Sequence, residues 1–247
     1  MKKLLYLCRQ QQNQPNMNKK KIVVFTGAGV SAESGLSTFR DSDGLWENYS
    51  IEEVCTHEAI ERNRELVIRF YNERRRDAMQ AEPNAAHRAI ADLQKYFDVE
   101  VITQNVDDLH ERAGSKKVTH LHGELMKLRS SINETATVAI DGWEQKPDAR
   151  HKDGSLLRPY IVFFGESVPN FEKAAAIASE ADVFVVVGTS LAVYPAASLL
   201  QYVDEQVPIY VVDPGMPELG RYRTRVTHIR EKASIGVPEV CQMLVNS

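Results

Sequence analysis

The sequence predicts an α/β fold in which a doubly wound parallel sheet carries a small inserted domain. Apolar, β-branched runs at 22–25, 99–103, 183–187 and 208–212 are typical of buried strands, and helical patterns separate them. Glycine or polar residues follow each run, as expected at the ends of parallel strands. The polar, weakly periodic stretch 129–157 interrupts this alternation, which predicts an insertion.

The first run leads into a glycine turn, Gly27 to Ala32, with the pattern Gly-x-Gly-x-x-Ala. Gly27 would permit a tight turn, Gly29 would let backbone N–H groups approach a pyrophosphate, and the small Ala32 would let a helix pack on the strand. The phosphate would lie at the helix N-terminus, which favours anions. Alone, the pattern also fits an ordinary glycine turn.

Residues 33–46 do not form the second strand that a dehydrogenase would place here. They are polar, carry two glycines, and contain Phe39, Arg40 and Trp46. No strand ends in an acidic residue about 20 positions after the turn, where the ribose is usually bound. We therefore expect a mobile cofactor loop and disfavour an oxidoreductase.

Composition narrows the class of protein. A net charge of −4 over 247 residues argues against general nucleic-acid binding. Cys8, Cys55 and Cys241 are too far apart for a disulfide framework, which favours a reducing, cytoplasmic setting. The apolar run near the N-terminus is too short for a signal peptide or a membrane span. We expect residues 1–20 to be a disordered or helical extension and 21–247 to be one domain.

The remaining elements follow from periodicity and from helix stops. Helices are predicted over 58–79, 85–94, 171–181 and 196–205, and a short strand over 117–121. The core would comprise about 21–40, 83–128 and 158–247, and the smaller module about 41–82 and 129–157.

Four motifs occur in order at predicted strand ends: 103–107 (TQNVD), 122–124 (HGE), 164–166 (FGE) and 188–190 (GTS). Each has a structural alternative: His122 as a hydrogen-bonded core histidine, Asn105 and Asp107 as helix caps, and the others as simple turns. Together with the glycine turn they resemble the sirtuins, and the bacterial desuccinylase-like class in particular. The resemblance extends from about residue 21 to residue 245.

The resemblance implies the NAD-binding form of the Rossmann-like fold, also called deoxyhypusine synthase-like, and NAD-dependent removal of acyl groups from protein lysines. The catalytic residues would be His122, as general base, with Asn105 and Asp107 at the nicotinamide. The residues implied to bind NAD are Gly27, Ala28, Gly29, Ala32, Glu33, Thr38, Phe39, Arg40, Trp46, Gln104, Asn105, Val106, Asp107, His122, Gly188, Thr189, Ser190, Asp213 and Ala233.

The products would be nicotinamide, free lysine and O-acyl-ADP-ribose, and the partners would be acyl-lysine proteins bound by a monomer. Phe164, Gly165 and Val193 would contact the substrate. Two other functions stay open: mono-ADP-ribosyl transfer to protein, and a non-catalytic module that binds NAD or ADP-ribose. His110 is a rival for the general base, although only His122 matches the family motif.

Tyr71 and Arg74 indicate the acyl preference. Residues three apart share a helix face, and a phenol with a guanidinium can hold a carboxylate. In the desuccinylase-like sirtuins such a pair binds the acidic tail of succinyl- or malonyl-lysine. The alternative is a solvated basic face, because Arg75 and Arg76 follow directly.

The sequence departs from the family at two places. Most sirtuins hold a structural zinc with two Cys-x-x-Cys pairs, but no cysteine lies between Cys55 and Cys241. We predict no metal, and an insertion packed around Ile132, Val138, Ile140 and Trp143. Asp213 stands where the family often has Asn near the adenosine ribose, and an acid there would disfavour NADP.

Overall fold

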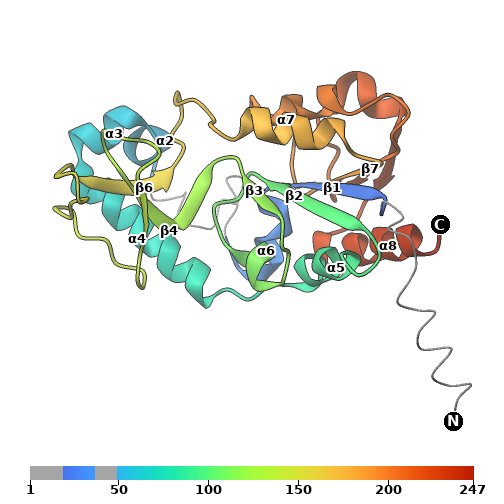
Figure 1. The fold of residues 1–247 in the computed structure, drawn as a ribbon, viewed down its shortest axis with the longest axis horizontal. Helices are drawn as coiled ribbons and strands as arrows, with labels where there is room; N and C mark the ends of the chain where they lie inside the picture. The colour runs from blue at the N-terminus through green and yellow to red at the C-terminus, as the bar shows by residue number, and fades with distance from the viewer. Residues whose placement is uncertain (1–18, 37–48) are drawn as a thin grey trace, which may run out of the picture.

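The computed structural model describes residues 19–36 and 49–247, and its large sheet confirms the predicted doubly wound parallel arrangement (Figure 1). The strands lie in the order β3-β2-β1-β7-β8-β9 and every neighbouring pair is parallel. Their bounds are β1 Lys21–Thr26, β2 Asp98–Thr103, β3 Val118–His120, β7 Val183–Val187, β8 Ile209–Val212 and β9 Val226–Ile229. The order reverses between β1 and β7, which is where such sheets bind ligands.

Alternate residues of each strand support opposite layers. Ile22 and Val24 pack with α5 (Ala85–Leu93) and α8 (Ala233–Val245), whereas Val23 and Phe25 pack with α7 (Phe171–Ser179) and η4 (Ala196–Tyr202). These two layers lie below and above the sheet in Figure 1. The short helices α6 (Leu109–Arg112) and η5 (Gly220–Thr224) complete this part of the molecule.

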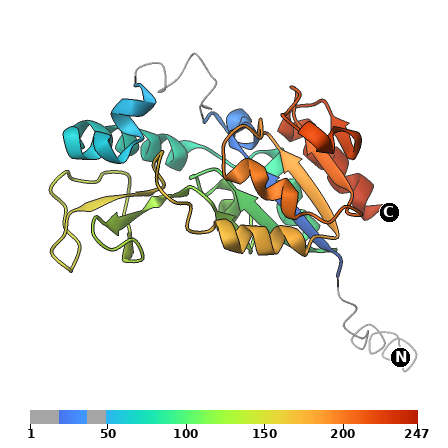
Figure 2. The same ribbon diagram turned by 90° about the horizontal axis from the view of Figure 1, so that it is seen from above.

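A smaller module lies at one end of the long axis, opposite the C-terminal helix (Figure 2). Its helices are α2 (Ile51–Val54), α3 (His57–Arg62) and α4 (Arg64–Gln80). Its antiparallel sheet has the order β5-β4-β6, with β4 Gly123–Ser130, β5 Thr137–Ala139 and β6 Leu157–Ile161. Residues 123–128 and 158–161, which the sequence placed with the core, thus form strands of the small sheet. Helices and sheet share one apolar cluster.

Several predicted helices are wrong in detail. The helix expected over 58–79 is divided at Asn63, whose side chain accepts a hydrogen bond from the N–H of Leu66 and caps α4. The segment expected to be α-helical over 196–205 is a 3₁₀ helix. After the glycine turn the chain forms two 3₁₀ turns, η1 (Ala28–Val30) and η2 (Ala32–Ser34), rather than a helix. Ala32 is exposed, so it does not serve helix–strand packing there.

The predicted interior of the insertion is also wrong. Ile132 is 77 % exposed and Trp143 is 39 % exposed, while Val138 and Ile140 are only partly buried. Buried polar groups lie there instead. Arg75 is fully buried, and its guanidinium donates to the carbonyls of Leu125 (2.7 Å) and Trp143 (2.6 Å).

Asn72 and Gln145 extend this polar interior. Asn72 exchanges hydrogen bonds with the Gln145 backbone, and the Gln145 side chain donates to the Leu157 carbonyl. In the sequence, these polar side chains are typical of a surface loop. Nothing local predicts their burial, because it depends on hydrogen-bond partners supplied by distant segments. Over residues 19–36 and 49–247, no helix has the length and apolarity of a membrane span.

Candidate functional site

The carboxyl ends of four parallel strands bring predicted site residues to one edge of the large sheet. Gly27 follows β1, Gln104 follows β2, Gly188 follows β7 and Asp213 follows β8. Gln104 donates from its side-chain amide to the Thr189 hydroxyl at 2.9 Å, which joins the loops after β2 and β7. The topology alone therefore gathers residues that are up to 186 positions apart in the chain.

The loops after β1 and β7 lie against each other with no room for side chains. A Cβ on Gly29 would lie 2.7 Å from the Gly188 Cα, and one on Gly188 would lie 2.5 Å from the backbone of Gly29 and Val30. Gly188 also has a φ of +58°, and Leu191, a few residues on, is a non-glycine residue at φ +57°. The glycines thus permit two backbones to meet at the reversal of strand order, where the Gly29 N–H donates to the Gly188 carbonyl at 2.9 Å and the Gly27 N–H donates to the Val187 carbonyl at 3.0 Å.

Ser31, Asn105 and Asp107 form a buried polar cluster beside these loops. The Asn105 amide donates to the Ser31 hydroxyl (3.0 Å), and that hydroxyl donates to Asp107 Oδ2 (3.1 Å). The Leu109 N–H donates to Asp107 Oδ1 at 3.2 Å. Burial raises the pKa of Asp107, although these hydrogen bonds act in the opposite direction. The cluster holds an amide and a carboxyl group in fixed positions, as recognition of a carboxamide requires.

His122 lies in the short junction between the two sheets, after β3 ends at His120 and before β4 begins at Gly123. Its Nδ1 donates to the Gln104 carbonyl at 3.0 Å, and its own carbonyl accepts from the Val162 N–H at 3.0 Å. Within the described residues, Nε2 has no hydrogen-bond partner. Burial lowers the pKa of His122, so the imidazole is neutral near pH 7 with Nε2 able to accept a proton.

The backbone around Gly123 shows why the HGE motif requires a glycine at this position. The residue has a φ of +91°, and a Cβ there would lie 2.0 Å from the Tyr160 carbonyl oxygen on β6. No L-amino acid with a side chain fits this position without moving β6. The motif therefore combines a histidine with the backbone geometry that carries the chain from one sheet to the next.

His110, the rival for the general base, is 1 % exposed. Its Nε2 lies 3.1 Å from the Thr26 hydroxyl, and its ring lies edge to face with His87, with centroids 4.8 Å apart. Burial lowers the pKa of His110 well below its usual value. A neutral histidine enclosed in this way supports β1 and β2 and has no open face toward a substrate.

Glu33, Ala233 and Asp213 lie at the same edge, in three different surroundings. Both Glu33 carboxylate oxygens accept hydrogen bonds from Ser234, from its N–H (2.9 Å) and its hydroxyl (2.7 Å). Ala233, the first residue of α8, is buried beside this contact. Asp213 Oδ1 accepts from the Gly215 N–H in a tight turn. Their roles toward NAD stay predictions.

The remaining predicted positions are placed as follows. Ala28 and Ser190 lie in the two glycine loops, and the Ser190 carbonyl accepts from the Glu218 N–H. Val106 packs against the apolar cluster of the small module, and its carbonyl accepts from the Leu125 N–H. Val193 is 41 % exposed. The predicted residues Thr38, Phe39, Arg40 and Trp46 lie outside the described part of the chain.

On the substrate side, Phe164 and Gly165 form the turn after β6. The Phe164 N–H donates to the Cys55 carbonyl at 2.8 Å, and the side chain is 47 % exposed. Tyr71, on α4, is 1 % exposed, and its hydroxyl lies 3.4 Å from the Cys55 sulfur. The guanidinium of Arg74 lies on the same helix, 5.8 Å from the Phe70 ring centroid.

Three residues of this region were not identified from the sequence. Ser31 joins Asn105 to Asp107, and its place inside the glycine turn was the available signal. His120 precedes His122 by two residues, which in a strand gives both the same face. Glu166 of the FGE motif accepts two bonds from Arg158, at 2.6 and 3.1 Å, and one from the Phe163 N–H. It therefore fixes the turn that carries Phe164.

The insertion, where most sirtuins carry two Cys-x-x-Cys pairs, contains no cysteine in this chain. In the described residues, no group of three or more histidine, cysteine or acidic side chains could hold a metal. The Ser130 hydroxyl lies 2.7 Å from that of Ser155 and accepts from the N–H groups of Ile132 and Asn133. Hydrogen bonds join the two loops here, and the lack of a metal in the protein stays a prediction.

A Sir2 family model matches residues 27–195, which contain the glycine turn, Asn105, Asp107, His122 and Gly188. The chain belongs to the Sir2 family. This sirtuin is 48 % identical over 232 residues to an NAD-dependent protein deacylase of Bacteroides thetaiotaomicron, covering 92 % of the chain and 98 % of that relative. It is 52 % identical to one of Aggregatibacter actinomycetemcomitans, covering 78 % and 92 %.

Solved structures agree with this assignment of the sirtuin. A Sir2 homologue mutant bound to ADP-ribose superposes with a TM-score of 0.84 at 38 % identity, covering 92 % of this chain and 93 % of the other. A Sir2 homologue–NAD complex gives 0.83 at 38 % identity, with 92 % and 90 % covered. The fold is therefore that of the family.

Proposed function

We propose that this sirtuin is an NAD-dependent protein lysine deacylase that prefers succinyl and malonyl groups. The general activity, NAD-dependent protein deacylation, is supported by its family and by the names of relatives about half identical to it. The acyl preference is carried by one observation, the Tyr71–Arg74 pair on α4 beside the turn that holds Phe164.

The pair has the chemistry to bind a carboxylate at the end of an acyl chain. Burial raises the pKa of Tyr71 well above its usual value, so the phenol stays protonated and can donate a hydrogen bond. Arg74 supplies a positive charge that acts on both Tyr71 and Cys55. Phe70 and Phe163 surround the phenol with apolar surface. A carboxylate there would gain charge-assisted hydrogen bonds that an acetyl group cannot make.

The described residues fit NAD at the edge of the large sheet. The glycine loops after β1 and β7 meet at the reversal of strand order, where parallel sheets bind ligands, and the Ser31–Asn105–Asp107 cluster offers fixed polar groups for a carboxamide. When bound, NAD supplies an electrophilic ribose carbon for the acyl oxygen. The protein's own part is to bind, to orient and to exclude water.

His122 accepts the proton in this proposal. Its Nδ1–H is committed to the Gln104 carbonyl, which fixes the tautomer and leaves Nε2 unprotonated. A ribose hydroxyl next to Nε2 could transfer its proton there as it becomes a nucleophile. Gln104 itself is held by Thr189, so the base and the loop after β7 are positioned together.

Rates on succinyl- and acetyl-lysine peptides with NAD test the acyl preference. We expect Arg74→Met to lower the ratio of kcat/KM for succinyl over acetyl peptide by about 10- to 100-fold, because a charge-assisted hydrogen bond contributes about 1.5–3 kcal/mol. Arg76→Met, an exposed arginine of the same helix, is the matched control and should leave the ratio unchanged. An unchanged ratio in Arg74→Met would refute the preference, while nicotinamide release by the wild type tests the general activity.

A further inference from the structure

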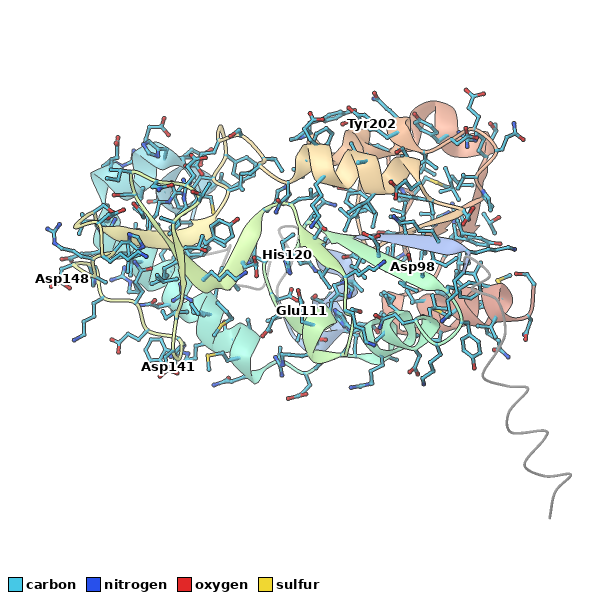
Figure 3. The ribbon with its side chains drawn as sticks, viewed as in Figure 1. Asp98, Glu111, His120, Asp141, Asp148 and Tyr202 are labelled. Atoms are coloured by element: carbon cyan, nitrogen blue, oxygen red, sulfur yellow. The ribbon has the colours of Figure 1, made fainter. Side chains whose placement is uncertain are left out.

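We propose that His120, with both ring nitrogens protonated, is a positioning residue that fastens the catalytic segment Gln104–Asp107 to helix α6, and that loss of its proton limits activity at alkaline pH. The inference rests on the proposed deacylase activity. Figure 3 labels His120 and Glu111 near the middle of the molecule, one above the other.

The partners of the imidazole determine its protonation state. Nδ1 lies 2.8 Å from the Asn105 carbonyl oxygen and Nε2 lies 2.8 Å from Glu111 Oε1. A carbonyl and a carboxylate only accept hydrogen bonds, so each nitrogen must donate. A neutral imidazole carries one N–H, and one of the two short contacts would then place two lone pairs against each other. The arrangement therefore requires an imidazolium.

The two hydrogen bonds of the His120 ring form a bridge that joins three elements around the catalytic segment. His120 ends β3, Glu111 lies on α6, and Asn105 follows β2. The backbone of His120 is held as well, because the Asn170 side chain donates to its carbonyl at 2.8 Å. His120 is 6 % exposed, so water does not readily replace these partners. Since the Asn105 side chain bonds Ser31, the bridge stabilises the same residue that orients the polar cluster.

The charged surroundings favour the cation. Burial opposes protonation, but the hydrogen bond and charge of Glu111, the Asn105 carbonyl and the more distant Glu124 outweigh it and raise the pKa of His120. Asp107 also faces this charge, which opposes the rise in its pKa that burial causes. Burial, together with the charges of His87 and His120, lowers the pKa of His110, so His110 is not a second cation here. The charge of Lys127 helps to lower the pKa of Glu111.

His120 and His122 thus make the same kind of contact through Nδ1 but differ at Nε2 and in their charge. Each donates from Nδ1 to a backbone carbonyl of the catalytic segment, Asn105 for one and Gln104 for the other. Only His120 has a carboxylate at Nε2. In the unfolded chain, His120 loses its proton as pH rises above about 6.5. In the folded protein its pKa is raised, so the hydrogen-bonded bridge persists to higher pH and is lost only when pH passes that raised pKa. An acid limb from His122 and an alkaline limb from His120 should therefore enclose the range of activity.

Two substitutions separate the two contacts of the ring. The amide nitrogen of Asn in His120→Asn occupies the place of Nδ1 and can still donate to Asn105, whereas that of Gln in His120→Gln occupies the place of Nε2 and reaches Glu111. We expect His120→Asn to have at least fivefold higher kcat/KM than His120→Gln at neutral pH, and a flat alkaline limb. Glu111→Gln keeps an acceptor but removes the charge, so its alkaline limb should move down by about one pH unit.

The measurements are kcat/KM for nicotinamide release from NAD and an acyl-lysine peptide across pH, melting temperatures, and NMR titration of His120 in the free protein. The NMR signal should show both ring nitrogens protonated at pH 7, and this reading does not depend on activity. Equal kcat/KM for the two His120 variants, an unmoved alkaline limb in Glu111→Gln, or titration of His120 below pH 6.5 would each overturn the inference. Equally lowered melting temperatures with unshifted pH profiles would show a purely structural role. A wild type that releases no nicotinamide would instead refute the proposed function.

Discussion

The large sheet and the small module are stabilised by different means. The strands β1, β7 and β8 lie between helices and are apolar on both faces, apart from Lys21 and Thr26 at the two ends of β1. The module combines an apolar cluster with buried charges: Arg75 is fully buried and Arg158 is 2 % exposed. We therefore expect substitutions at the sheet edge to affect chemistry, and substitutions of the buried arginines of the module to affect stability.

The two regions also use glycine differently. At the edge of the large sheet, Gly29 and Gly188 let two loops meet at the reversal of strand order, where such sheets bind ligands. At Gly123, the absent side chain lets the first residue of β4 pair closely with Ile161 of β6, directly after the junction from the large sheet. The first use serves binding and the second serves architecture, although both appear as short glycine motifs in the sequence.

The largest expected effect concerns the sheet edge. His122→Ala should lower kcat/KM for deacylation by about 10²–10⁴-fold, the range that a general base contributes. Since burial lowers the pKa of His122, wild-type activity should fall only as pH drops below about 6.5, and the variant should lose this limb. A pH series of nicotinamide release measures both. His57→Ala, an exposed histidine of α3, is the control, and a His122 variant as active as that control would contradict the assignment.

The next effect concerns the module. Arg158 holds Glu166 with both terminal guanidinium nitrogens, and the Arg158 side chain is 3 % exposed. Burial of Glu166 raises the pKa of its carboxyl, but the hydrogen bonds and charge of Arg158 outweigh this and lower that pKa. Arg158→Met should cost about 3 kcal/mol of unfolding free energy, near the low end for a broken buried pair because Arg129 also contacts Glu166. Urea denaturation measures it against Arg69→Met, an exposed arginine of α4. If Arg158→Met lowers the unfolding free energy no more than Arg69→Met does, buried charges do not stabilise the module and the two regions do not differ in this respect.

The smallest effect tests the hydrogen-bonded loops of the module. Ser130 is 1 % exposed, and its hydroxyl serves Ser155 and two backbone N–H groups. Ser130→Ala should lower the unfolding free energy by about 1–2 kcal/mol, because two hydrogen bonds in partly buried surroundings lose their acceptor. Ser131→Ala, exposed and adjacent, should change it little. One equivalent of zinc per chain in elemental analysis of the wild type would show instead that a metal joins these loops.

Much of the large sheet was predictable because its signals are local. The apolar runs at 22–25, 99–103 and 183–187 became β1, β2 and β7, and the polar residues after them lie at the expected edge. The module was predicted less well. Ile132 and Trp143, apolar in sequence, are exposed, whereas Arg75 is fully buried. Hydropathy cannot anticipate this, since a buried arginine depends on carbonyls supplied by segments 50 or more residues away.

The sequence by itself determined the positions of the buried strands β1, β2, β7 and β8, which loops contain glycine, and which polar residues follow each of these strands, because these properties depend on neighbours along the chain. Only the tertiary structure decided that Ser31 joins Asn105 to Asp107, that His110 is enclosed while His122 keeps Nε2 free, and that His120 meets Glu111. These contacts depend on the order of the strands in the sheet, which brings together atoms that no local pattern relates.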